Sequence, residues 1–208
     1  MLVMVAMVSS CASMFARPAP SSLFQLEYTP QFVACRTSFP ASVRMWPLEA
    51  SSPYDQEAMV VLSDAARVRY SSQYSWVAQP GKLVADWLLR DISQSLLFAS
   101  VMTSGETFAT SYDLGGRLFA FSWQRRGDRW EAVLDAEITL VENRSGQPRR
   151  VVLRKPYRLV SEPVTEHAPE AFVRSMSKLM GEFSAALQQD LCVLAGQVPT
   201  PSGGPANP

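Results

Sequence analysis

The stretch that decides the fold runs from Arg129 to Glu142 and reads "RWEAVLDAEITLVE". From Trp130 to Leu140 apolar residues occupy every second position, and mostly polar residues stand between them. A side-chain period of two is typical of a β-strand, and a single apolar face is typical of an antiparallel sheet with one side against the core. The stretch therefore predicts a long, half-buried antiparallel strand.

Two similar stretches flank this strand. "LFAFSWQ" (residues 118–124) precedes it, and "RVVLRKPYRLV" (residues 150–160) follows it. "RRGD" and "NRSG" separate the three runs, and each places a glycine where a tight turn needs one. We therefore predict a three-stranded meander. Nearer the N-terminus, the runs "SLFQLEY", "SVRMWPLE", "AMVVLS" and "ARVRY" predict further short strands.

Two segments change to a helical period. In residues 79–98 one apolar stripe contains Val84, Trp87, Leu88, Ile92 and Leu96. In residues 168–191 a second stripe contains Phe172, Met176, Leu179, Met180, Phe183, Leu187 and Leu191. We therefore predict an α+β fold, in which an antiparallel sheet that includes the three-stranded meander has two amphipathic helices packed on one face.

The N-terminus has the pattern of a lipoprotein signal. Residues 1–8 are apolar, and Ser9-Ser10 precede Cys11, so that "VSSC" resembles the bacterial lipobox. No Lys or Arg precedes the apolar run, which leaves open a start upstream, and an ordinary N-terminus is the alternative. The predicted organisation is a signal remnant (1–10), a lipidated Cys11 with a Pro-containing tether (11–21), one domain (22–195) and a disordered tail (196–208).

The other two cysteines, Cys35 and Cys192, lie near the two ends of the predicted domain. A secreted or periplasmic chain can keep such a pair oxidised, which favours a Cys35–Cys192 disulfide. Two separate buried thiols remain the alternative, because free cysteines often behave as small apolar residues.

Composition and motifs argue against several functional classes. Lys plus Arg number 19, as do Asp plus Glu, so the chain lacks the basic excess typical of nucleic-acid binding. The sequence contains no GxSxG or HExxH motif and no Cys/His cluster at metal spacing. Its only histidine, His167, precedes the predicted last helix and is interpreted as a helix-start residue. We therefore predict a protein that is not an enzyme and has no cofactor or metal.

Three stretches in this order resemble the ABC-type transport auxiliary lipoprotein family, over about residues 24–192: "RVRYSSQYSWVAQPGKLVADWLL" (67–89), "SYDLGGRLFAFSWQ" (111–124) and "EAFVRSMSKLMGEFSAAL" (170–187). The family pattern has an Arg and a Tyr ahead of a Trp-Ala-x-Pro stretch that opens a helix, and then a Tyr-x-Leu before an apolar-aromatic strand. The matching residues are Arg69, Tyr70, Trp76, Pro80, Tyr112, Leu114 and Phe121. Val77 departs from the pattern because it separates Trp76 from Ala78.

The resemblance implies a non-catalytic periplasmic lipoprotein of an MCE-type ABC transport system that moves phospholipid or another hydrophobic molecule. Its partners would be an MCE-domain protein and the permease and ATPase subunits, and its lipid would anchor it to the outer membrane. Ala12 is similar to the outer-membrane sorting pattern. Whether the protein forms a homo-oligomer stays open.

Aromatic residues before the first helix form the candidate partner contact: Tyr70, Tyr74 and Trp76. The alternative for these residues is that they pack the base of that helix. The alternative function is an outer-membrane assembly lipoprotein that binds a β-barrel partner or a hydrophobic ligand.

Overall fold

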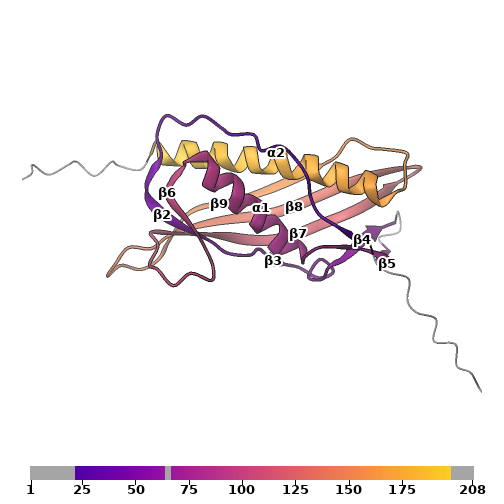
Figure 1. Cartoon of the computed structure of the whole chain (residues 1–208), viewed down its shortest axis with the longest axis horizontal. Helices are drawn as coiled ribbons and strands as arrows, with labels where there is room; N and C mark the ends of the chain where they lie inside the picture. Colours follow the sequence, from indigo (N-terminus) through magenta and orange to yellow (C-terminus); the bar gives the residue numbers. More distant parts are fainter. Residues whose placement is uncertain (1–21, 64–66, 198–208) are drawn as a thin grey trace, which may run out of the picture.

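The computed structural model describes residues 22–63 and 67–197 (Figure 1). The predicted signal segment, Cys11, the tether to residue 21, and residues 198–208 of the predicted tail lie outside this part of the chain. The elements, in chain order, are β1 (Ser22–Phe24), β2 (Phe39–Met45), β3 (Glu49–Ala50), β4 (Ala58–Leu62), β5 (Val68–Trp76), α1 (Pro80–Ser95), β6 (Phe98–Thr103), β7 (Tyr112–Arg126), β8 (Arg129–Glu142), β9 (Arg150–Val160) and α2 (Pro169–Ala195).

The three long strands β7, β8 and β9 are antiparallel neighbours in sequence order. The apolar face predicted from the alternation in β8 is confirmed, because its side chains are fully buried: Ala132, Leu134, Ala136, Ile138 and Leu140. The next side chain of the pattern, Trp130, is only partly buried. β8 thus contributes a continuous row of buried side chains to the core.

The sheet is mixed, which corrects the prediction of an antiparallel sheet. The second edge of β7 pairs in parallel with three short strands in succession: with β2 at Tyr112, with β3 at Arg117 and with β4 at Ser122. β2 also pairs in parallel with β6, and β1 with β5. These partners are far apart in the chain, and a local period of two does not distinguish parallel from antiparallel neighbours.

The two helices contact each other, and Figure 1 shows them side by side across the long strands. α1 packs on β6 and β7, and α2 packs on β8 and β9. All seven residues of the predicted α2 stripe are buried. In α1, the predicted stripe residues Val84, Leu88 and Ile92 are buried. Leu96 is 77% exposed, so its predicted place in the buried stripe is wrong. The helix ends at Ser95, and Leu96 turns outward in the left-handed region at φ 57°, so that Leu97 fills the core instead.

Between β1 and β2, residues 25–38 form an extended strap along the helices (Figure 1). Leu26 anchors the strap in the core with no exposed surface. At its far end Cys35 is bonded to Cys192 of α2, with 5.4 Å between the Cα atoms, which confirms the predicted disulfide. The strap and its disulfide therefore join the first strand to the C-terminal part of the last helix.

Neither helix in residues 22–63 and 67–197 combines the length and the apolar character that a membrane crossing needs.

Candidate functional site

The predicted contact residues on β5 have different environments. Trp76 is fully buried, with its ring edge-on to Phe121 of β7 at 5.1 Å and to Phe172 of α2 at 5.3 Å. Trp76 is therefore a core residue, which corrects its predicted role as a partner contact. Tyr70 is 50% exposed, and Tyr74 is half-buried against Phe24 of β1. Only the two tyrosines are placed where another molecule could reach them.

Both tyrosines line an open cavity of about 750 Å³ between the β4–β5 pair and the start of α2. We call it the β5 cavity. It is lined by Met59, Val61, Ser63, Arg67, Arg69, Tyr70, Ser71, Tyr74, Trp123, Arg125, Trp130, His167, Ala168, Pro169 and Phe172. Met59, Trp123 and Phe172 are almost completely buried, whereas the three arginines are exposed. The cavity therefore combines an apolar, aromatic floor with a cationic rim, and none of the described residues that line it is acidic.

One wall of the β5 cavity is a row of stacked rings. Trp123 and Trp130 lie 6.0 Å apart at 11°, and His167 stacks on Trp130 at 3.9 Å and 17°. Two backbone hydrogen bonds between Trp130 and Val164 bring this segment to the sheet. His167 precedes Ala168, the N-cap of α2, so its predicted position at the helix start is correct. Its ring also forms part of the cavity, which the sequence did not indicate.

The strand that presents the tyrosines has one incompletely paired edge. β4 pairs with β5 from Val68 to Tyr70 and again at Ser75. On the other edge, β1 pairs only with Tyr74, Ser75 and Trp76. Among the described residues, 68–70 thus have a strand neighbour on one side only, and 71–73 pair with neither strand. The backbone N–H groups of Gln73 and Tyr74 donate to the Ser71 hydroxyl. Val68 and Tyr70, 42% and 50% exposed, lie along this open edge.

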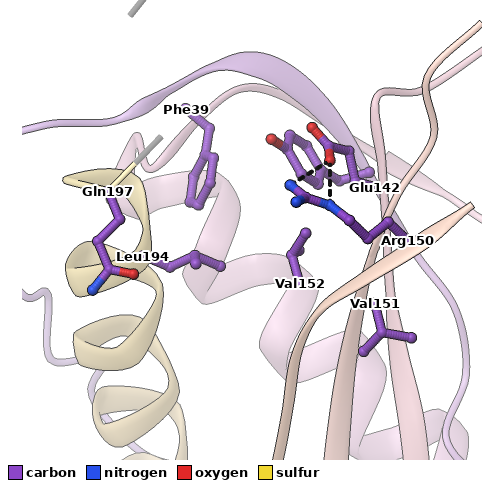
Figure 2. Close-up of a pocket in the computed structure, with 8 residues that line it drawn as sticks. Phe39, Glu142, Arg150, Val151, Val152, Leu194 and Gln197 are labelled. Carbon is purple, nitrogen blue, oxygen red and sulfur yellow. Dashed lines mark hydrogen bonds and ion pairs between the residues drawn. The ribbon is translucent and has the colours of Figure 1, made fainter. Parts of the chain in front are cut away.

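A second cavity, of about 310 Å³, lies near the other end of α2, where Leu194 and Gln197 line it (Figure 2). The Arg150 guanidinium donates to Glu142 at 2.9 Å, and Arg144 donates to the same carboxylate at 2.9 Å. Burial alone would raise the pKa of Glu142, but the hydrogen bonds from the two arginines outweigh it and lower the pKa. Because the charged groups of this cavity already pair with each other, the β5 cavity is the stronger candidate site.

No group of three or more His, Cys, Asp or Glu residues within 22–63 and 67–197 is arranged to hold a metal ion. The predicted lipidation site, Cys11, lies outside the described residues and stays a prediction.

The fold is that of a small α+β domain, and the β5 cavity lies between its β4–β5 pair and the start of α2. The sequence profile of the family described as the ABC-type transport auxiliary lipoprotein component matches residues 24–188, and the chain belongs to this family. No curated protein matches the sequence.

Crystal structures of similar proteins have the same fold at low sequence identity. A DUF330 family protein from Xanthomonas campestris superimposes with a TM-score of 0.70 at 15% identity, over 85% of this chain and 98% of that chain. An uncharacterized protein gives a TM-score of 0.60 at 13% identity, over 83% and 99% of the two chains. A hypothetical protein from Chlamydia trachomatis gives 0.52 at 6% identity, over 74% and 99%.

Proposed function

We propose that this protein is the non-catalytic periplasmic lipoprotein of an MCE-type ABC transport system that moves phospholipid or another hydrophobic molecule between membranes. Family membership supports a role as an auxiliary transport component. The lipobox-like sequence at Cys11 supports attachment to a membrane, and Ala12 supports the outer membrane. On this proposal, ATP hydrolysis and substrate movement belong to the other subunits.

The observation that underlies the proposal of a contact role is the open edge of β5. An unpaired strand edge offers backbone N–H and C=O groups to an extended segment of another protein, and neighbouring side chains then give specificity. Tyr70 stands exposed on this edge, and Tyr74 lies where β1 begins to cover it. We propose that an MCE-domain or permease subunit docks along residues 68–70, where β5 has an open edge, and contacts the rings of Tyr70 and Tyr74.

Co-purification from detergent-solubilised cell envelopes tests the proposal. Tyr70→Ala and Tyr74→Ala should each reduce recovery of the transporter subunits, because aromatic interface anchors commonly contribute about 2 kcal/mol, near thirtyfold in affinity. Phe108→Ala is the matched control, because Phe108 is 67% exposed and lies in the loop between β6 and β7. The Phe108→Ala variant should recover as much of the transporter subunits as the wild type does.

Two results would contradict the proposal. Unchanged recovery of transporter subunits with both tyrosine variants would remove β5 as the docking edge. Recovery of an outer-membrane β-barrel protein without any transporter subunit would instead establish the assembly-lipoprotein function. Thermal unfolding of each variant shows whether a loss of recovery reflects a lost contact or a lost fold.

A further inference from the structure

We propose that the β5 cavity binds an anionic amphiphile, a molecule with a negatively charged head and an apolar chain. This inference concerns a ligand of the chain itself and goes beyond the docking of a partner along β5. It can be tested on the purified protein without any transporter subunit.

The cationic rim is the first observation. The side chains of Arg67 and Arg69 form no hydrogen bond or ion pair with any residue that the structure describes. Most other arginines of the described surface pair with a carboxylate, as Arg117 does with Glu49 and Arg158 with Asp135. Guanidinium groups bind carboxylates and phosphates well because their donors match the geometry of these anions. The guanidinium groups of Arg67 and Arg69 are therefore available to bind the anionic head of a ligand.

The floor supplies an unused donor. The indole Nε1–H of Trp123 is buried and has no hydrogen-bond acceptor among the described residues, although Trp123 lines the cavity and is only 2% exposed. Buried polar groups are rarely left unpaired in native proteins, so such a donor calls for an explanation. Because this nitrogen has almost no exposed surface, an acceptor oxygen from a ligand in the cavity would satisfy it only if the side chains that cover it move aside.

The start of α2 favours the same charge. Ala168 and Pro169 line the cavity, and no side chain caps this end of the helix. A helix N-terminus has a positive partial charge that favours anions. Glu170 in the first turn is exposed, and nearby Glu166 pairs with Arg174, so neither carboxylate lines the cavity. The helix end thus adds to the attraction of the arginines for an anion.

The rest of the lining is suited to an apolar chain. Met59 and Phe172 form the floor with Trp123, and the stacked rings of Trp130 and His167 form a wall. The volume, about 750 Å³, falls within the roughly 300–1,000 Å³ typical of sites for small molecules. Because the three floor residues are almost completely buried, the apolar surface open to a ligand lies mainly on Trp130, His167 and the two tyrosines, and a small hydrophilic anion would leave it without a partner. An acidic peptide paired along β5 would use the edge of the strand and not the floor.

Calorimetric titration of the full-length protein tests the proposal with three probes. Lysophosphatidylglycerol has an anionic head and one chain, lysophosphatidylcholine has a zwitterionic head on the same chain, and inorganic phosphate has no chain. We expect the anionic lipid to bind at least tenfold more tightly than the zwitterionic one and phosphate to show no measurable binding. Equal affinity for the two lipids, or binding of phosphate alone, would overturn the proposal.

Variants then locate the site. The double variant Arg67→Gln/Arg69→Gln should weaken binding of the anionic lipid at least tenfold, and Trp123→Phe, which removes the N–H donor together with part of the ring, should weaken it severalfold. The matched control is Arg36→Gln, because Arg36 is also exposed but lies in the strap, outside the cavity lining. If the double variant keeps its fold by circular dichroism and binds the lipid as the wild type does, the proposal is wrong. Binding of an acidic peptide without binding of the lipid would likewise overturn it in favour of a protein ligand.

Discussion

The Tyr28 hydroxyl donates a hydrogen bond of 2.7 Å to Oδ2 of Asp91, a carboxylate on α1 with no exposed surface. Ser184 of α2 donates to the same oxygen at 2.6 Å, and Arg90 donates to Oδ1 at 2.7 Å. One buried carboxylate therefore joins the strap to both helices. Arg90 also lies 4.0 Å from the ring centre of Trp87, which places its charge over an aromatic face.

We expect Tyr28→Phe to destabilise the fold. The change removes one donor from a buried carboxylate, and an unmet hydrogen bond of this kind costs about 1–3 kcal/mol. Urea unfolding should show this loss, whereas Tyr70→Phe, on an exposed ring, should leave the free energy of unfolding unchanged. Equal stability of the two variants would mean that Tyr28 contributes no net hydrogen-bond energy.

The same hydrogen bond should make the free energy of unfolding decrease at high pH. Burial, together with the hydrogen bond to Asp91, raises the pKa of the Tyr28 hydroxyl above its usual value of 10.0. The protonated form is thus favoured in the folded state, so the contribution of Tyr28 is complete below pH 10 and is lost as the pH rises further. The stability difference between wild type and Tyr28→Phe should therefore shrink above pH 10.

Much of the core was predictable from sequence because its signals are local. The alternation in β8 and the stripe of α2 depend only on neighbouring residues, and apart from the half-buried Trp130 both predicted the buried side chains correctly. The three short strands beside β7 were not predictable as parallel, because their pairing joins segments about 60–70 residues apart. The helical segment was predicted to run to residue 98, but α1 ends at Ser95, since nothing in "QSLLF" distinguishes Leu96 from Leu97 as the residue that turns outward.

The candidate site was less predictable for the same reason. Tyr70, Tyr74 and Trp76 are similar residues on one strand, and only the packing of Trp76 against Phe121 and Phe172 decides that it is buried. The β5 cavity forms where β4, β5, β7, β8 and the start of α2 meet. No local pattern relates Trp123 or Trp130 to His167, so the cavity became evident only in three dimensions.

The Cys35–Cys192 disulfide should contribute strongly to stability. It closes a loop with a sequence separation of 157, for which chain entropy gives on the order of 5 kcal/mol, although real bridges often contribute less. Cys35→Ala/Cys192→Ala should lower the midpoint of urea unfolding, and a reducing agent should lower that of the wild type to a similar value. A midpoint that is insensitive to reduction in the wild type would contradict this expectation.

Gly81 in the first turn of α1 should not tolerate a side chain. A Cβ atom there would lie 2.1 Å from the carbonyl oxygen of Leu48. Alanine favours a helix by about 1 kcal/mol over glycine, but overpacking typically costs about 1–3 kcal/mol. Because the nearest atom belongs to the backbone, we expect the clash to dominate and Gly81→Ala to lower the melting temperature. Gly105→Ala is the control, since a Cβ atom there meets nothing within 4 Å, and a lower melting temperature for both variants would contradict the clash.

The carboxyl group of Glu142 should make the free energy of unfolding decrease at low pH. The pKa of its carboxyl is held below the usual value of 4.5 by Arg144 and Arg150, against the effect of burial. The ionised form is favoured in the folded state, so its contribution is complete above pH 4.5 and is lost as the pH falls below that value. Both arginines are more than half exposed, which limits the contribution to about 1 kcal/mol. Glu142→Gln should be less stable than the wild type at pH 7 and approach it in acid, and a difference that is constant with pH would refute the expectation.

Lipid attachment at Cys11 is the prediction on which membrane anchoring depends. An acyl chain contributes about 0.8 kcal/mol for each buried methylene, and more than one chain gives stable anchoring. Cys11→Ala should therefore move the protein from the membrane fraction to the soluble fraction. Because Cys11 lies outside the Cys35–Cys192 loop, the melting temperature should not change, and Cys35→Ala/Cys192→Ala should show the reverse pattern, with reduced stability and normal fractionation. Mass spectrometry of the native protein should find a lipid-modified Cys11 as the first residue, and an unmodified N-terminus upstream of Cys11 would show that the lipobox-like sequence is not processed.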